Sequence, residues 1–269
     1  MQHVALIQLN VGPDPAQNLP QTLSYLKKAA EGGADFILTP ECSNFLCAET
    51  RDTRALAVVQ EEEPLLQAAQ VLAQEHKVWV CLGSLILRKP ASDKLANRQI
   101  LIDPRGQIVT TYDKIHLFDV SLDQGEGYRE SQTYDRGTKA KVSQIGEVRL
   151  GHAICYDLRF PALFRGLQAD VQLLPAAFTV TTGQAHWHPL LRARAIENGC
   201  FVLAAAQTGL HDGTRRTYGH SLALDPWGEV LLDMGTEPGV GFVDLDLSQV
   251  ARRRAQIPAM TADQDFDWT

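Results

Sequence analysis

Residues 151–161 read GHAICYDLRFP, and this stretch indicates an α/β fold more directly than any other part of the chain. The apolar run over residues 148–154 predicts a sheet strand that ends at Cys155. Pro161 suits the first turn of a following helix, where its missing N–H costs nothing. A cysteine on such a strand-to-helix turn resembles a nucleophile elbow, and the N–H groups of a helix start would favour its thiolate.

Two other apolar segments end at a charged residue. Glu41 follows the strand-like residues 36–40, and Lys114 follows a hairpin predicted over residues 98–111. Because loops at strand ends converge at one edge of a sheet, we expect both side chains near Cys155. Taken singly, a Glu or a Lys is most simply a solvated surface charge. Taken together with the thiol, they suggest a base, a cation and a nucleophile.

These three segments resemble the motifs of a known family. Glu41 in TPE, Lys114 in YDKIHLF and Cys155 in GHAICYDLRFP are similar to the Glu-Lys-Cys triad of the nitrilase, or carbon–nitrogen hydrolase, superfamily. The motifs occur in the family's order, and the resemblance covers residues 4–258. The C-terminal half is most similar to the branch that includes deaminated-glutathione amidase, while the omega-amidase branch shares the triad. The segments that carry this similarity are TGQAHW (182–187), LLRARAIE (190–197), AAAQTG (204–209), YGHS (218–221) and DPWG (225–228).

Strand-like and helix-like segments alternate along the chain, with no internal repeat, linker or change of composition. Strands are expected over residues 4–9, 35–38, 78–82, 84–87, 141–145, 148–154, 171–174, 201–206, 218–224, 229–232 and 239–245, and helices over 18–31, 63–76, 161–168, 184–197 and 248–255, the last capped by Ser248. Residues 118–138 lack periodicity and predict an active-site loop. We expect one domain over residues 1–269, with 259–269 as an extended tail. The alternation favours an α/β fold, and the resemblance implies a four-layer α-β-β-α sandwich of the nitrilase type.

Composition narrows the possible partners. The chain has 269 residues, 45% hydrophobic and 21% charged, with a net charge of −7. This acidic balance argues against nucleic acid and anionic membranes as partners, and no apolar run is long enough to cross a bilayer. The cysteines are odd in number and their spacings match no disulfide framework, and we see no secretory signal. These features predict a cytoplasmic protein with reduced thiols.

The predicted chemistry needs no cofactor. Glu41 accepts the thiol proton as Cys155 attacks an amide carbon, because a free thiol is mostly protonated at neutral pH. Lys114 and the backbone N–H of Tyr156 stabilise the negative oxygen that forms. Ammonia leaves, and water then hydrolyses the thioester. Histidine has no part in this scheme, and His116 is expected to be structural.

The roles of several residues remain open at this point. The family often has a second glutamate in the loop after the lysine; Glu130 is the preferred candidate for positioning Lys114 and Glu126 is the alternative. Arg159 either clamps a substrate carboxylate or forms a structural pair with Asp157 or Glu197. Phe178 and Thr182 are expected to line the pocket with Tyr156. Nothing in the sequence accounts for His152. The remaining histidines, which are His186, His188, His211 and His220, match no standard metal-ligand spacing, so no metal is expected.

The leading hypothesis is an amidase that acts on a small carboxylated linear amide, with deaminated glutathione as the preferred substrate. Its alternatives are an omega-amidase acting on alpha-ketoglutaramate, an acyl-transferring or N-carbamoyl-hydrolysing enzyme, and a catalytically inactive binding protein. The intact trio of Glu41, Lys114 and Cys155 argues against the last alternative. The resemblance also implies a homodimer or a larger homo-oligomer, through the helix after Cys155 and the C-terminal segment.

Overall fold

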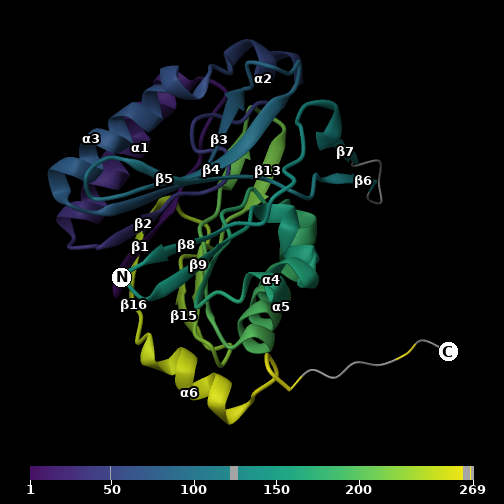
Figure 1. Ribbon diagram of the computed structural model, residues 1–269. Coiled ribbons are helices and arrows are strands. Elements are labelled where there is room, and N and C mark those ends of the chain that lie inside the picture. Colours follow the sequence, from purple (N-terminus) through teal and green to yellow (C-terminus); the bar gives the residue numbers. More distant parts are fainter. Residues whose placement is uncertain (49, 122–126, 263–266, 268–269) are drawn as a thin grey trace.

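The computed structural model describes residues 1–48, 50–121, 127–262 and 267. Two six-stranded sheets lie face to face in the middle of the molecule, and helices cover both outer sides (Figure 1). The four-layer α-β-β-α sandwich expected from the sequence is therefore confirmed. Each sheet has three parallel strands in its centre and antiparallel strands at its edges.

The first sheet is built largely from the N-terminal half of the chain. Its strand order is β16 (Gly239–Asp244), β1 (His3–Gln8), β2 (Phe36–Leu38), β3 (Trp79–Arg88), β4 (Leu95–Ile102) and β5 (Ile108–Asp113). Helices α1 (Pro15–Glu31) and α3 (Pro64–His76) pack beside each other on its outer face (Figure 1). β16, which comes from the C-terminal end of the chain, pairs with β1 and joins the two halves of the sequence in one sheet.

The second sheet carries the remaining layers. Its strand order is β15 (Val230–Asp233), β14 (Leu222–Leu224), β11 (Phe201–Ala204), β10 (Val171–Leu173), β9 (Val148–His152) and β8 (Val142–Ile145). Helices α4 (Pro161–Leu167) and α5 (Val180–Asn198) pack together over this sheet, and α6 (Ser248–Gln256) lies below it in Figure 1.

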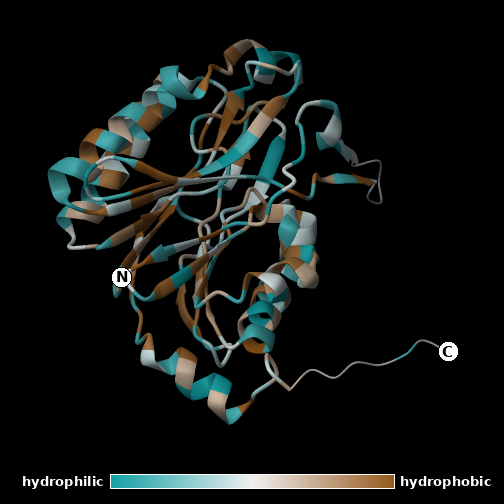
Figure 2. Ribbon diagram, in the orientation of Figure 1, coloured by the Kyte–Doolittle hydropathy of each residue, from teal (hydrophilic) through white to brown (hydrophobic). Residues whose placement is uncertain are grey.

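Alternation of side chains along the strands divides the hydrophobic core into three layers. In β1, Val4 and Leu6 face the second sheet, whereas Ala5 and Ile7 face α1 and α3. In β11, Phe201 and Leu203 point into the space between the sheets, and Val202 and Ala204 point toward α5. Strands buried on both faces are hydrophobic throughout, which is why the central strands are brown in Figure 2 while the helices show both colours.

Residues 118–138, expected to be one irregular loop, contain regular structure instead. Strands β6 (Asp119–Ser121) and β7 (Gly127–Arg129) form a hairpin that projects at the right of Figure 1, and the short 3-10 helix η3 (Glu130–Gln132) follows. A second hairpin, β12 (Thr208–His211) and β13 (Arg215–Tyr218), was also not expected: the sequence predicts no strand over residues 207–217 and places Tyr218 in the following strand. Helix α2 (Thr50–Leu56) and the 3-10 helix η1 (Gln60–Glu62) were not expected at all.

Other boundaries differ for local reasons. The expected break at Gly83 is only an irregularity within the continuous strand β3. Helix α5 begins four residues early, because the Thr179 side chain caps it. Ser248 does not cap α6; its hydroxyl donates a hydrogen bond to Asp246. At the start of the expected tail, Arg165 donates a hydrogen bond to the carbonyl of Ala259, and residues 263–266 and 268–269 lie outside the described part of the chain.

Candidate active site

The four side chains predicted to be catalytic line one cavity of about 610 Å³. Glu41 follows β2 and Lys114 follows β5 in the first sheet, whereas Cys155 follows β9 in the second sheet. Glu130 begins the 3-10 helix η3. The carboxyl ends of β2 and β9, which are central strands of the two sheets, and of the edge strand β5 therefore converge on this cavity. The alternative second glutamate, Glu126, lies outside the described residues.

Lys114 is buried between two carboxylates. Its Nζ lies 3.0 Å from Glu41 Oε1 and 2.8 Å from Glu130 Oε2. Burial alone would lower the pKa of Lys114, but these two carboxylates raise it well above its usual value. Burial likewise acts to raise the pKa of Glu41, yet the Lys114 ammonium holds this pKa below its ordinary value. Both groups are therefore charged at neutral pH.

Cys155 occupies the turn that the sequence predicted. Its φ of 48° lies in the left-handed region, and the residue begins the 3-10 helix η4 (Cys155–Arg159). Other influences on this thiol outweigh any effect of the helix start. Burial, together with the negative charge of Glu41, raises the pKa of the Cys155 thiol well above its usual value, and Lys114 offsets this only in part. The nucleophile is therefore a protonated thiol beside a charged carboxylate.

Asp157 fastens this elbow to the loop that carries Lys114. Its buried carboxylate accepts a hydrogen bond from the Tyr112 hydroxyl at 2.7 Å and another from the Ile154 N–H at 2.9 Å. It also accepts the His116 N–H at 3.0 Å, and the His116 ring nitrogen Nδ1 lies 2.6 Å away. The ring of His116 stacks on Phe160. His116 is thus hydrogen-bonded and packed beside the lysine loop, as expected.

Asn97, which sequence reasoning missed, and Ala177, which was expected at the pocket, complete the surroundings of Glu41. The Asn97 side-chain amide donates to Glu41 Oε1 at 2.8 Å and to Glu130 Oε1 at 3.3 Å. The Ala177 N–H donates to Glu41 Oε2 at 2.8 Å. These bonds fix the carboxylate in one orientation. The sequence carries no clear signal for Asn97, because β4 also contains Arg98 and Gln99 and the strand register decides which side chain faces the cavity.

Gly83 allows the loop of Glu41 to pass close to β3. A Cβ atom at this position would lie 1.8 Å from the carbonyl oxygen of Thr39, so no other residue fits without moving the backbone. The Gly83 N–H donates to the Thr39 hydroxyl, and the Ser84 N–H donates to the Pro40 carbonyl. The loop is therefore held against β3 immediately before Glu41.

Of the four residues expected to bind substrate, three line the cavity. Tyr156, Phe178 and Thr182 are among its lining residues, with Thr182 in the first turn of α5. Arg159 is not. Its guanidinium packs over the rings of Tyr156 and Phe178 and contacts His186 Nδ1 at 3.2 Å.

Neither partner proposed for Arg159 is found beside it. Asp157 is occupied by the contacts described above, and Glu197 pairs with Arg194 at 2.8 Å, so the expected structural pair is wrong. The alternative role of Arg159 as a clamp for a substrate carboxylate stays a prediction.

His152 has a structural place. It is buried between the sheets, with Nδ1 beside the Gln99 side-chain oxygen of β4 and Nε2 2.7 Å from the Ser143 hydroxyl of β8. Burial lowers the pKa of His152 to about 4, so the ring is neutral and can donate to one partner and accept from the other. The residue that the sequence left unexplained is a polar link between the two sheets.

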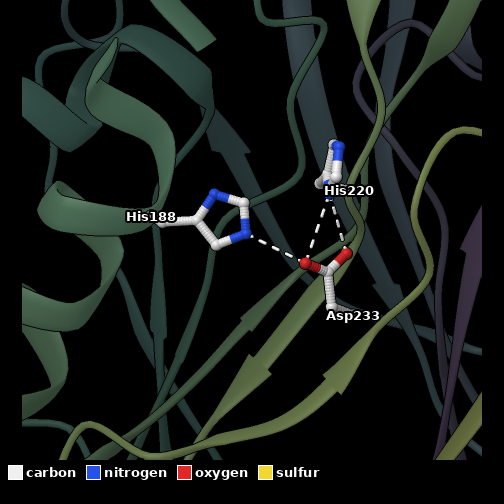
Figure 3. Close-up of side chains that lie close together, drawn as sticks. All are labelled: His188, His220 and Asp233. Carbon is white, nitrogen blue, oxygen red and sulfur yellow. Dashed lines mark hydrogen bonds and ion pairs between the residues drawn. The ribbon is translucent and has the colours of Figure 1, made fainter. Parts of the chain in front are cut away.

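A second histidine group lies apart from the cavity. Figure 3 shows Asp233 between His188 and His220; His188 Nε2 is 3.0 Å from Asp233 Oδ2, and His220 Nδ1 is 2.9 Å from Oδ1. Among the described residues this is the one cluster whose spacing could hold a metal ion. Hydrogen bonds within the group already satisfy the carboxylate, and none of its residues lines the cavity.

This arrangement defines a thiol hydrolase: a buried nucleophile, a carboxylate base beside it and an ammonium aimed at the same cavity. Residues 3–255 match the family model for carbon–nitrogen hydrolases, so the chain belongs to the carbon–nitrogen hydrolase family. It is an amidase that hydrolyses carbon–nitrogen bonds other than peptide bonds. In the part of the chain that the structure describes, no helix is both long and apolar enough to pass through a membrane.

Known proteins resemble the chain over nearly its whole length. A deaminated glutathione amidase from Yersinia enterocolitica is 42% identical over 96% of this chain and 91% of its own length. The NitFhit protein of Caenorhabditis elegans superposes with a TM-score of 0.92 at 34% identity, over 98% of this chain and 65% of that longer one. An amidase from Nesterenkonia sp. AN1, in which acrylamide has added to the active-site cysteine, superposes with a TM-score of 0.78 at 26% identity over 96% of this chain and 98% of its own.

Proposed function

We propose that this protein hydrolyses a small carboxylated linear amide through a thioester on Cys155, and that its substrate is deaminated glutathione. One observation carries the proposal: the thiol of Cys155 lies beside the Glu41 carboxylate, which pairs with the Lys114 ammonium at 3.0 Å. The 42% identity to a deaminated glutathione amidase supports the choice of substrate.

In the first half of the reaction, the sulfur of Cys155 attacks the amide carbon while its proton passes to Glu41 Oε2 or Oε1. The carbonyl oxygen becomes negative, and Lys114 Nζ together with the N–H of Tyr156 stabilises it. The Tyr156 N–H is available because the first N–H groups of a helix have no intrahelical acceptor. When the tetrahedral intermediate collapses, the carbon–nitrogen bond breaks and Glu41 returns the proton to the departing nitrogen.

In the second half, water attacks the thioester and Glu41 accepts its proton. The carbon–sulfur bond breaks, a carboxylic acid leaves, and the thiol of Cys155 regains its proton. Glu130 holds Lys114 in place through both of its oxygens. For a primary amide the departing group is ammonia, as the sequence suggested. Deaminated glutathione is a substituted amide, so its departing group is an amine.

The test is a substrate panel with the purified protein: deaminated glutathione, alpha-ketoglutaramate, an N-carbamoyl amino acid and an uncharged primary amide. We expect the highest kcat/KM for deaminated glutathione and no turnover by Cys155→Ala. A preference for alpha-ketoglutaramate would instead indicate an omega-amidase. Turnover by Cys155→Ala would overturn the thioester mechanism.

Acrylamide provides a second test. Intact-mass and peptide analysis should locate one adduct on Cys155. The mapping is needed because Cys42 and Cys47 also line the cavity. An inactive binding protein would show neither this adduct nor turnover.

Three further expectations belong to this proposal. The protein acts in the cytoplasm, which its five free thiols favour, and it works as a homodimer or larger homo-oligomer. Residues 1–269 form one domain.

Exposed apolar side chains on α5 and near β15, namely Ile196, Trp227, Val230 and Leu231, favour a contact between subunits there. Sedimentation of the wild type and of Ile196→Glu tests the dimer; a wild-type monomer would contradict it.

A further inference from the structure

Arg215, in β13, lies in the wall of the reaction cavity without a partner for its charge. Within the described residues, no carboxylate is within ion-pair distance of its guanidinium, and its buried Nε has no hydrogen-bond partner. Arg215 is half-buried, and a guanidinium that is partly removed from water without a counter-charge is unfavourable, because its desolvation is not compensated. A bound ligand that carries a negative charge would supply the compensation.

The other cations that line the cavity are already engaged. Lys114 is bonded to Glu41 and Glu130. Arg129 donates from one terminal nitrogen to the carbonyls of Val120 and Tyr128, and from the other to the Ser121 hydroxyl. Among the described lining residues, Arg215 is therefore the cation whose donors remain available for a ligand.

The position of Arg215 is fixed by its surroundings. Its guanidinium carbon lies 5.9 Å from the centre of the Tyr128 ring. In the β12–β13 hairpin, Arg215 pairs with His211, whose two ring nitrogens contact the Val11 carbonyl and the Thr217 hydroxyl at 2.7 Å each. The hairpin is thus attached to the chain that leaves β1, and the guanidinium is held at the cavity instead of moving freely in solvent.

We propose that Arg215 binds a carboxylate of the amide substrate that lies away from the scissile bond, and so determines the preference for carboxylated amides. This inference rests on the proposed amidase function and adds its anchoring group. A planar guanidinium can bind a carboxylate through two parallel hydrogen bonds. This task is one of the two alternatives that the sequence leaves open for Arg159.

The carboxylate can belong to the acyl part or to the amine part of the substrate, and two probes distinguish these. In the Cys155→Ala protein, calorimetry measures the dissociation constants of 2-oxoglutarate, which mimics the acyl part, and of cysteinylglycine, which mimics the amine part. Adding Arg215→Met should raise the dissociation constant of one of these two ligands by about 10- to 100-fold, the range expected for a charge-assisted hydrogen bond. The dissociation constant of the other ligand should stay unchanged.

Kinetics on the active protein test selectivity directly. For a carboxylated amide, Arg215→Met should raise KM by about 10- to 100-fold with kcat little changed. For the methyl ester of the same amide, the KM of Arg215→Met should equal that of the wild type. Arg215→Lys keeps the charge without the planar guanidinium, so its KM for the carboxylated amide should lie between those of the wild type and Arg215→Met. Arg216→Met is the matched control, because Arg216 is the exposed neighbour on the same strand and does not line the cavity.

Equal losses for the acid and its ester, or no change in any dissociation constant, would overturn the assignment. So would a loss of discrimination in Arg159→Met that Arg215→Met does not show. A wild type that hydrolyses no amide would refute the amidase function alone, because the calorimetric measurements still decide whether Arg215 binds carboxylates.

Discussion

At the scale of single residues, the charge of Lys114 controls the site. Two buried carboxylates depend on this one ammonium, and it keeps Glu41 ionised and able to accept a proton. The lowered pKa of Glu41 contributes stability above its unfolded pKa of about 4.3, and this contribution is lost as pH falls through the lower folded value. The same pair therefore links stability to catalysis.

Lys114→Met should lower kcat by at least about 10³-fold, because it removes the cation beside the developing oxyanion. It should also lower the free energy of unfolding at pH 7 by about 3–5 kcal/mol, since two buried carboxylates lose their partner. Without the ammonium, burial raises the pKa of Glu41, so this deficit should shrink at pH 5. Urea unfolding at both pH values checks this, with the exposed Lys139→Met as control. An equal deficit at both would contradict it.

His152 makes a separate contribution to pH dependence. Its folded pKa of about 4 is below the unfolded value of 6.5, so the unfolded chain binds the proton more tightly. Stability should therefore fall by about 3 kcal/mol as pH drops from 6.5 to 4. Because His211 also has a pKa of about 4, His152→Gln should remove only part of this slope. Unchanged slopes in thermal unfolding would show that His152 is not the group responsible.

At the scale of elements, one carboxylate joins the lysine loop after β5 to the cysteine elbow after β9. Asp157 accepts hydrogen bonds from Tyr112 and His116 on one side and from Ile154 on the other. The relative position of Lys114 and Cys155 therefore depends on this side chain, which itself touches no substrate.

Asp157→Asn puts an amide NH₂ opposite a backbone N–H of either Ile154 or His116, so at least one hydrogen bond is lost and two donors face each other. We expect a loss of about 2–4 kcal/mol in stability and a fall in kcat of about 10- to 100-fold, because small displacements of reacting groups are costly. Tyr112→Phe removes one bond and should cost only about 1 kcal/mol. Equal effects of the two variants on kcat would argue against this role of Asp157.

How far the sequence predicted these elements depends on what each residue signals. Glu41, Lys114 and Cys155 could be grouped because each follows an apolar strand, and strand ends meet at a sheet edge. Asn97 and Arg215 lie within strands, where a shift of one residue reverses the side-chain direction. The sequence alone therefore could not predict that these two side chains face the cavity. Arg159 was considered for the cavity because it follows Cys155 by four residues, whereas its guanidinium packs over the rings of Tyr156 and Phe178 and is not among the lining residues.

At the scale of the whole molecule, the central hydrophobic layer holds the two sheets together. Phe36 and Leu38 from the first sheet and Leu173, Phe201 and Leu203 from the second belong to this layer. Hydrophobic alternation predicted these strands, but which face meets the other sheet depends on the packing of the whole chain.

Phe201→Ala should lower the free energy of unfolding by about 3–5 kcal/mol, because the side chain is fully buried between the sheets. The urea midpoints for lost activity and for lost tryptophan fluorescence should shift together. Val71→Ala, at an exposed position of α3, should change stability by less than about 0.5 kcal/mol. Activity that survives beyond the fluorescence transition would contradict this dependence.

The reaction cavity takes its base and its ammonium from one sheet and its sulfur from the other. A polypeptide cut at the exposed residues 138–140 would leave two fragments, neither of which contains a complete set of reacting groups. β16 of the C-terminal fragment would have to insert beside β1 of its counterpart before any turnover appeared. Split in this way, the protein would be a complementation reporter, silent as separate pieces and enzymatically visible only after reassembly.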